Sequence, residues 1–347
     1  FTKKYIVEVI YVLDIDFNQI VNMIENRRSK AYKKVNEEMV LLYLDIGKFL
    51  YDLKSNSGYG DKIVAKAAEF MKSNYPQLRG FTKRNLERMI QFYSTYKEDE
   101  IATPLVTQLS WTNNLLILSG AKTKEERYFY LKLAIKNNYS KRELDRQITS
   151  SYYERFILSE GKQLPTIKKT VDEDDYPNTR LLDTYSLEFL DLPNEYNEMD
   201  LKKSIIRNLK DFILEIGNDF TYIGDEYKVQ IGNHDFFIDL LFYNRELSCL
   251  VAFELKLGEF KAEYLGKMNL YLEALDRNVK KDYENPSVGI ILCSSKDKEV
   301  VEYSLSKNMS QTMISEYRLK LIDKKILEMK LKEMKSLLEE VDKQLEV

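Results

Sequence analysis

The chain has 347 residues, of which 44% are hydrophobic and 31% charged, a composition typical of a soluble globular protein with two domains and not of a disordered one. Its apolar runs are shorter than the roughly 20 residues that a transmembrane helix needs, and its first residues lack the features of a signal peptide, so we expect a cytoplasmic protein. The formal charge of -3 is uneven, because residues 1–158 carry 26 Lys and Arg against 19 Asp and Glu (+7), whereas the remainder carries 27 against 37 (-10). This asymmetry favours different partners for the two halves, although ordinary solvated surfaces would also explain it.

Residues 1–158 are predicted to form an all-α domain, because apolar residues recur there at steps of three and four. Thr82 is a suitable N-cap, and Ser140 followed by Glu143 has the spacing of a capping box. The helices are expected at residues 17–53, 61–71, 82–93, 111–119, 124–137 and 140–159.

Two of these helices begin with clusters of basic residues. In helix-turn-helix modules the start of the recognition helix meets DNA, where basic side chains and free backbone N–H groups face phosphates. We therefore predict that this domain is helix-turn-helix-like and binds DNA, with solvated faces of a helical bundle as the alternative. The candidate DNA-binding residues are Lys83, Arg84, Arg88, Lys141, Arg142 and Arg146.

Residues 159–197 are predicted to form an acidic linker, because they contain three prolines and the run Asp172–Asp175. Residues 198–323 follow a different pattern, with short apolar segments between amphipathic ones. We predict an α/β domain in the order α-β-β-β-α-β. Its helices are expected at 201–216, after Gly258 and at 298–305, and its strands at 227–231, 236–243, 247–255 and 287–293.

Residues 324–347 are predicted to form a C-terminal helix with heptad spacing. Apolar residues alternate there at steps of four and three, with charges at the other positions, as a coiled-coil seam requires. This spacing favours a homo-oligomer assembled through the helix, and the alternative is a terminal helix packed on its own domain. The seam consists of Leu327, Leu331, Met334, Leu338, Val341 and Leu345.

Three charged residues occupy unusual positions in the predicted strands. Asp239 is the only charge between Phe236 and Phe242. Glu254 and Lys256 close a strand that is apolar throughout, and being two residues apart they lie on the same face. Because an unpaired buried charge costs several kcal/mol, these residues need a partner or a metal ion. A hairpin between the two strands would bring Asp239 and Glu254 together.

The pattern predicts a catalytic metal centre. With only His234, Cys249 and Cys293 available, several imidazole or thiolate ligands are excluded, so a metal must be held by oxygen atoms, which points to Mg²⁺ or Mn²⁺. The expected ligands are Asp239, Glu254 and the backbone carbonyl of Leu255. Such an ion could activate water and neutralise a scissile phosphate, while Lys256 orients or deprotonates the water or stabilises developing charge.

Two further interpretations concern the same strands. Asp235 lies four residues before Asp239, on the same strand face, and is a candidate accessory ligand. A purely structural salt bridge between Asp239 and Lys256 is the alternative to a catalytic centre.

The segment that holds Asp239, Glu254 and Lys256 resembles the PD-(D/E)xK nuclease superfamily, and in particular its bacterial YhcG family. The similarity includes residues 232–244 and 260–269. It extends into the N-terminal half through residues 80–86 and 109–112, and so covers nearly the whole chain.

This resemblance implies a helical N-terminal domain joined to a restriction-endonuclease-like domain. Related nucleases often carry a Gln and a Tyr four residues apart on the next helix; here Tyr271 matches and Lys267 departs, and both are accessory candidates. Many relatives also have a glutamate on the first helix, which residues 202–207 lack, although Glu198 is near. The implied function is a metal-dependent endonuclease acting on DNA, including branched or structured DNA. The alternative is a catalytically inactive DNA-binding or assembly protein that retains the fold.

Overall fold

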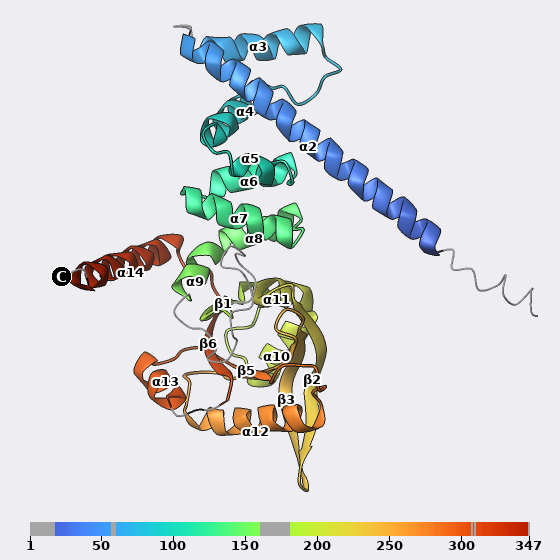
Figure 1. Cartoon of the computed structure of the whole chain (residues 1–347). Coiled ribbons are helices and arrows are strands. Elements are labelled where there is room, and N and C mark those ends of the chain that lie inside the picture. Colours follow the sequence, from blue (N-terminus) through green and yellow to red (C-terminus); the bar gives the residue numbers. More distant parts are fainter. Residues whose placement is uncertain (1–17, 57–59, 160–180, 307, 309, 346–347) are drawn as a thin grey trace, which may run out of the picture. The chain divides into compact units, whose positions relative to one another are not determined.

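A computed structural model describes residues 18–56, 60–159, 181–306, 308 and 310–345. The chain divides into two compact units, Phe1–Lys141 and Arg142–Val347. The first is helical and the second contains a mixed sheet with helices (Figure 1). This confirms the predicted fold class. The division assigns the helices after residue 141 to the second unit, whereas the sequence pattern grouped all of residues 1–158 together.

The first helix among the described residues, α2, is long, and its C-terminal part packs on α4. Val40 and Leu50 of α2 are buried. Gly47 allows the close approach, because a Cβ atom there would lie 2.2 Å from the backbone oxygen of Met89. Thr82 caps α4 as predicted, its hydroxyl accepting from the Asn85 N–H at 3.4 Å. The helices are α2 (Asn18–Asn56), α3 (Gly60–Asn74), α4 (Lys83–Tyr96), α5 (Ala102–Val106), α6 (Trp111–Gly120) and α7 (Lys124–Lys136).

The second unit is built on a sheet with the strand order β1-β6-β5-β4-β3-β2. Strands β1, β6, β5 and β4 run parallel, and β4, β3 and β2 pair antiparallel. The strands are β1 (Thr184–Ser186), β2 (Phe220–Ile231), β3 (His234–Asn244), β4 (Cys249–Leu255), β5 (Val288–Cys293) and β6 (Thr312–Arg318).

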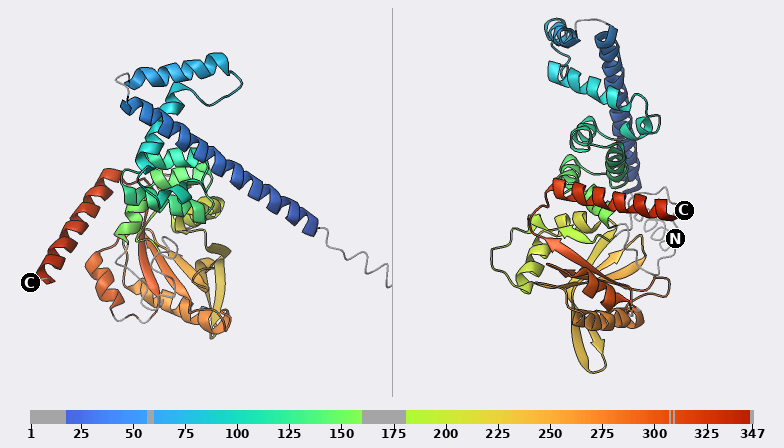
Figure 2. Two further views of the ribbon diagram at one scale, coloured as in Figure 1. Left: turned by 45° about the horizontal axis from the view of Figure 1, so that its top comes forward. Right: turned by 90° about the vertical axis from the view of Figure 1, so that its left-hand side faces the viewer.

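Helices cover this sheet, as two views in Figure 2 also show. Met268 and Tyr271 of α12 pack with Ile238 and Ile291 of the strands. Phe212 of α11 contacts the rings of Phe242 on β3 and Phe253 on β4. The helices of this unit are α8 (Lys141–Thr149), α9 (Tyr152–Leu158), the 3-10 turn η1 (Glu188–Leu190), α10 (Glu198–Arg207), α11 (Leu209–Ile216), α12 (Glu263–Asn278), α13 (Lys298–Leu305) and α14 (Lys324–Leu345).

Several local features differ from the sequence prediction, including the unpredicted helix α5 and the division of the helix expected at 140–159 into α8 and α9. The helix expected at 201–216 is interrupted at Asn208, where α10 ends and α11 begins. Strands β1 and β6 were not predicted as part of the sheet. Residues 181–197, which the pattern assigned to a linker, contain β1 and η1 with Tyr185 and Leu187 fully buried; residues 160–180 lie outside the described residues.

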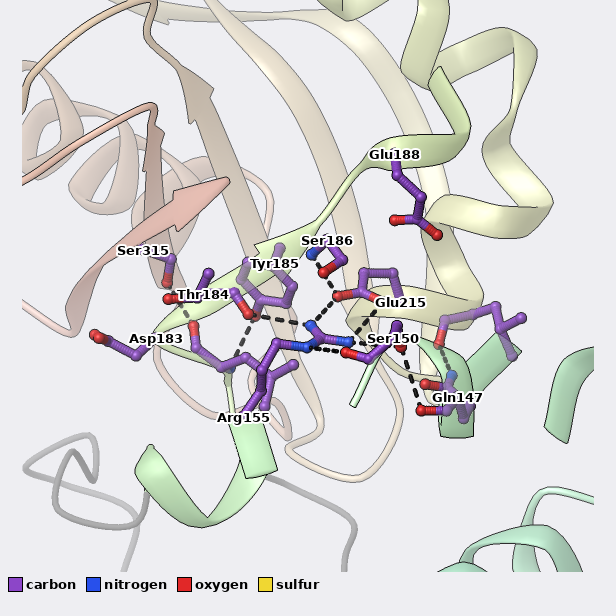
Figure 3. A network of polar contacts seen from close by, with 12 residues as sticks. Gln147, Ser150, Arg155, Asp183, Thr184, Tyr185, Ser186, Glu188, Glu215 and Ser315 are labelled. Carbon is purple, nitrogen blue, oxygen red and sulfur yellow. Dashed lines mark hydrogen bonds and ion pairs between the residues drawn. The ribbon is translucent and has the colours of Figure 1, made fainter. Parts of the chain in front are cut away.

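A buried ionic network joins α8 and α9 to the sheet (Figure 3). The Glu215 carboxylate on α11 is fully buried and binds the Arg155 guanidinium, which is 1% exposed. The same carboxylate accepts from the Ser186 N–H at 2.7 Å and from Arg146 Nη1 at 3.0 Å. Arg155 also donates to the Ser150 backbone and hydroxyl oxygens. Because both arginines converge on one carboxylate, α8 and α9 are fixed to the sheet domain.

The C-terminal helix α14 begins by packing on α9 of its own unit. Leu327 and Leu331 are 4% and 9% exposed, and Lys324 pairs with Glu154 at 3.2 Å. The first two residues of the heptad seam are therefore buried within their own chain. This agrees with the alternative interpretation, a terminal helix packed on its own domain. The side chains of Leu338, Val341 and Leu345 lie outside the described ones, so assembly through α14 stays a prediction.

The network predicts a large stability effect at Glu215. Replacing Glu215 by Gln removes the buried negative charge that faces Arg155, while Arg146 keeps its second partner, Glu188. Breaking a buried ion pair in this way typically costs about 3–5 kcal/mol. Calorimetry should show the transition of the second unit at a lower temperature. Glu273→Gln, which removes an exposed partner of Arg277, should change stability by less than about 1 kcal/mol. Equal effects of the two substitutions would contradict this stabilising role of Glu215.

Candidate active site

Asp239 and Glu254 lie side by side where the pairing of β3 with β4 ends. The last pair in this ladder is Leu240 with Phe253, so the next residues along, Asp239 and Glu254, stand opposite each other on one sheet face. Beyond that point, the Asp239 side chain takes the place of a backbone acceptor, because the Leu255 N–H donates to Asp239 Oδ2 at 2.9 Å. The predicted convergence of the two acids follows from this register.

Two lysines share one oxygen of Glu254. Lys256 Nζ is 3.0 Å and Lys267 Nζ 2.6 Å from Glu254 Oε1. Glu254 is 1% exposed, and its other oxygen, Oε2, is buried without a hydrogen-bond partner. Lys256 therefore pairs with its strand neighbour Glu254, whereas the structural alternative required a salt bridge to Asp239.

Helix α10 adds residues that the sequence pattern did not assign. Glu198 Oε2 is 3.2 Å from Lys256 Nζ, so the glutamate near the start of this helix does reach the site. Lys202 is nearly buried, and its Nζ lies 2.7 Å from Glu226 Oε1 and 3.7 Å from Asp239 Oδ1. Helix α10 thus places one acidic residue, Glu198, and one basic residue, Lys202, at the edge of the site.

Glu226 completes a row of acids across three strands. It stands on β2 between the pairs Asp225–Leu240 and Tyr227–Ile238, and so opposite Asp239. Its backbone has φ +45°, in the left-handed region that is uncommon for residues other than glycine, Asn and Asp. A strained position beside a cluster of acids is a frequent feature of functional sites.

Helix α12 closes the site with the two accessory candidates. Besides binding Glu254, Lys267 Nζ lies 5.3 Å from the centre of the Tyr271 ring. The Tyr271 side chain is buried, and its hydroxyl donates to the backbone oxygen of Phe237 on β3. Tyr271 therefore joins α12 to the strand that carries Asp239, and it positions Lys267.

The electrostatics of the site oppose full ionisation of Asp239. Burial raises the pKa of the Asp239 carboxyl, and the adjacent Glu254 charge raises it further. The Leu255 N–H and the ammonium groups of Lys202 and Lys267 counteract this rise without cancelling it. A bound cation between the two acids would remove the repulsion that the lysines only partly offset.

Lys256 is held in its charged form. Burial alone would lower the pKa of its ammonium group, but the carboxylates of Glu254 and Glu198 outweigh that effect and raise the pKa above its ordinary value. At neutral pH Lys256 is consequently protonated in this arrangement, and it is suited to orient a water molecule or to stabilise negative charge.

The structure fits a divalent cation that takes part of its shell from water. Among the described residues, no three His, Cys, Asp or Glu side chains gather closely enough to enclose an ion alone. Asp239 with Glu254 nevertheless offers two adjacent carboxylates, and Glu254 Oε2 is a buried acceptor with nothing to bind. Mg²⁺ is commonly held by one or two carboxylates plus waters.

One predicted site residue lies elsewhere, and the role of another stays a prediction. Asp235 forms an exposed pair with Lys228 at 2.7 Å, four residues from Asp239 and thus roughly 13 Å along the strand. Strand spacing therefore separates Asp235 from a cation held by Asp239 and Glu254, and Asp235 is not an accessory ligand.

The backbone N–H of Leu255 lies at the site, where it donates to Asp239. Metal ligation by the Leu255 carbonyl stays a prediction.

The predicted DNA-binding residues divide into two groups. Lys83 and Arg84 are exposed at the start of α4, Arg88 is half-buried, and Lys141 and Arg142 are exposed at the start of α8. Arg146 is different, because its side chain is only 14% exposed and its guanidinium binds Glu215 and Glu188. Its charge is neutralised inside the protein, so it is not available for phosphate.

Comparison with known proteins identifies both parts of the chain. Residues 178–333 match the family model of the YhcG PDDEXK nuclease domain, and residues 19–155 match that of the DUF1016 N-terminal domain. The sheet-containing part is thus a nuclease domain of the PD-(D/E)xK class. The chain thus combines a DUF1016 N-terminal domain with a YhcG PDDEXK nuclease domain that follows it.

A relative from Escherichia coli strain K12 has the same extent. The protein named "Putative nuclease YhcG" is 29% identical over 354 residues, which cover 92% of this chain and 94% of that protein.

Within the described residues, no helix has both the length and the apolar character that crossing a membrane requires.

Solved structures give only distant likenesses. A repair endonuclease from Pyrococcus abyssi is 20% identical with a TM-score of 0.24, over 37% of this chain and 48% of that one. The EndoMS–dsDNA complex is 18% identical with a TM-score of 0.26, over 36% and 48%. The chain thus spans about half the length of these proteins, and likeness of this degree does not define a substrate.

The adjacent acids predict a stability gain on removing one charge. In metal-free buffer at neutral pH, Asp239→Asn should melt a few degrees higher than the wild type, because the neutral amide can still accept from the Leu255 N–H. Because the pKa of Asp239 is raised in the folded protein, the wild type loses stability as the pH rises through that pKa. The higher melting temperature of Asp239→Asn should therefore disappear in acid, where the wild-type carboxyl is also neutral. Melting curves from pH 3 to 8 measure this. A lower melting temperature for the variant at neutral pH would contradict a net repulsion at Asp239.

Proposed function

We propose that the protein is a divalent-metal-dependent endonuclease that hydrolyses phosphodiester bonds in DNA, including branched or structured DNA. The observation that carries the proposal is the pairing of Asp239 and Glu254 on adjacent strands, with Glu254 Oε2 buried and unpartnered and Lys256 beside it. These are the residues that resemble the motif of PD-(D/E)xK nucleases, and the family match supports nuclease chemistry.

In this proposal, Asp239 and Glu254 hold Mg²⁺ or Mn²⁺, with the Leu255 carbonyl as a further oxygen ligand. When bound, the cation supplies Lewis acidity that neutralises charge on the scissile phosphate. The protonated Lys256 orients the attacking water and stabilises negative charge on the phosphate oxygens, and it does not serve as the base in its resting state. Glu198 also holds Lys256, its Oε2 lying 3.2 Å from the ammonium nitrogen.

Residues 1–158 supply the DNA-binding residues in this proposal, at the start of α4 in the first unit and at the start of α8, where the second unit begins. The support is the formal charge of +7 over residues 1–158 and the exposed basic residues at the starts of α4 and α8. Free N–H groups at a helix N-terminus favour phosphate, and nearby lysine and arginine side chains increase that preference. The candidate DNA-binding residues are therefore Lys83, Arg84, Arg88, Lys141 and Arg142. Arg146 is not one of them, because its guanidinium binds Glu188 and Glu215.

Cleavage assays with paired aspartate variants test the catalytic proposal. Purified protein with Mg²⁺ or Mn²⁺ should cut at least one of linear, single-stranded or branched DNA. Asp239→Asn should reduce the rate by a factor of about 1,000 or more, because it removes a charge that the transition state needs. Asp235→Asn, the same change on the same strand, should leave the rate within about threefold of wild type, because Asp235 lies outside the site.

Two results would reject the catalytic proposal: no cleavage of any DNA, or cleavage that survives Asp239→Asn. Manganese binding without cleavage would favour the alternative of a DNA-binding protein that retains the fold. Titration calorimetry distinguishes these outcomes, because an intact site should bind Mn²⁺ and Glu254→Ala should abolish the binding.

Lys267 is proposed to compete with the cation for Glu254. Its ammonium group lies 2.6 Å from Glu254 Oε1, and that carboxylate raises the pKa of Lys267 although burial acts to lower it. A positive charge fixed there repels a divalent cation at the same carboxylate. Lys267 thus holds the Glu254 carboxylate in place before metal binds, and it weakens the binding that follows.

Removing this ammonium group should tighten metal binding. Lys267→Met should lower the dissociation constant for Mn²⁺ by a factor of roughly 3 to 10, in line with one Coulomb interaction of about 1 kcal/mol. Lys281→Met, which removes an exposed lysine from the loop after α12, is the matched control and should leave the constant unchanged. Calorimetry measures both, and weaker binding by Lys267→Met would show that Lys267 supports the ion instead.

A further inference from the structure

Helix α2 carries two apolar faces, of which one packs within the first unit. That face begins at Val40 and includes Gly47 and Leu50, which contact α3 and α4. The preceding part of the helix, residues 19–36, is exposed throughout. In Figure 1 this part of α2, in dark blue, reaches well past α4. Most helical stability in proteins comes from the packing of an apolar face, so a helical arm without such packing calls for a partner.

The second apolar face runs almost the whole length of α2. Its residues lie on a side roughly 120° around the helix from the packed face, with one pair at Ile20 and Ile24 and a longer group from Val35 to Leu53. A stripe of several large apolar side chains exposed on one side of a helix marks an interaction surface, unlike single exposed side chains. The large apolar members and their exposed fractions are Ile20 (53%), Ile24 (46%), Val35 (60%), Met39 (38%), Leu42 (42%), Phe49 (64%) and Leu53 (39%).

The charges along one edge of this stripe change sign at its centre. Arg27 and Lys34 precede the midpoint, and Glu38 and Asp45 follow it; all four are exposed. If two copies of α2 pair antiparallel about Asn36, Arg27 faces the partner's Asp45 and Lys34 faces the partner's Glu38. A single register therefore satisfies both pairs, and twofold symmetry repeats each of them. When two helices pair antiparallel, each helix places this edge against the same edge of its partner. The charges on this edge therefore face one another across the pair.

We propose that α2 pairs antiparallel with α2 of a second copy of this chain, through the stripe from Ile20 to Leu53. The pairing covers a helix length of about 50 Å, enough to bury roughly 800 Å² on each chain, which is the size of a stable interface. The resulting homodimer is held by α2 and does not depend on the C-terminal helix. It also does not depend on the proposed nuclease activity.

Charge distinguishes this partner from the other candidates. A nucleic acid or an anionic membrane would attract Arg27 and Lys34 but repel Glu38 and Asp45 along the same edge. A second α2 complements all four. The intrahelical contacts of Lys34 with Glu37 and Glu38, at 3.0 and 3.1 Å, are solvent-exposed and leave the apolar stripe uncovered.

Sedimentation of the full-length protein tests the assembly. At micromolar concentration the wild type should sediment with about twice the chain mass of 41.1 kDa. Val35→Glu, which places a charge at the middle of the stripe, should be monomeric. Asn26→Glu adds the same charge on the opposite side of the same helix and should stay dimeric. A monomeric wild type, or a dimer that survives Val35→Glu, would overturn the proposal, and a monomer that binds phosphatidylserine vesicles would assign the stripe to lipid instead.

Two further measurements test the antiparallel register. Arg27→Glu should weaken dimerisation several-fold, and the combination Arg27→Glu with Asp45→Lys should restore it, because the swap reverses both charges of each pair. Mild oxidation should cross-link a mixture of Ile24→Cys and Phe49→Cys chains but not Ile24→Cys chains alone. Cross-linking of Ile24→Cys chains with each other would indicate parallel helices and refute the register.

Discussion

The candidate site depends on one hydrogen bond, from the Leu255 N–H to the Asp239 carboxylate. It forms where the backbone pairing of β3 and β4 stops, so the side chain continues the ladder in place of the main chain. This fixes Asp239 directly beside Glu254 without any contribution from flexible loops. The positions of both acids follow from strand register, which is set by the apolar residues on either side.

The lysines explain how two neighbouring acids are tolerated in a folded protein. Lys202, Lys256 and Lys267 come from a helix, a strand end and a second helix, and each contacts one of the two carboxylates. Their charges reduce the repulsion but do not fill every acceptor, since Glu254 Oε2 is left without a donor. The site is thus ordered before a cation arrives, at some cost in stability. Such costs are common where a fold is shaped for function and not for maximal stability.

Sequence alone was sufficient for the features that depend on local pattern. A single acid in an apolar strand, followed by an acid and a lysine closing a buried strand, identified Asp239, Glu254 and Lys256. What it could not supply depends on tertiary contact. Lys202 and Glu226 lie in polar segments and have no distinguishing local signal. Strand β6 was missed because its central Ser and Glu interrupt the apolar pattern, although the parallel partner β5 buries most of it.

Arg146 shows the converse error. Its position in a basic cluster at a helix start was typical of a DNA-binding residue, yet the fully buried Glu215, almost 70 residues away in sequence, binds it inside the protein. Neighbouring Arg142 has the same local pattern and is exposed. Charge patterns near a helix start therefore do not separate a phosphate-binding arginine from one that holds a domain together; only the three-dimensional partner does.

Anomalous diffraction from crystals soaked in Mn²⁺ would show most directly whether Asp239 and Glu254 together hold a divalent cation. We expect a single strong anomalous peak between the two carboxylates, within bonding distance of Glu254 Oε2. A fully occupied manganese ion elsewhere, with no density between these two side chains, would mean that the paired acids are not a metal site.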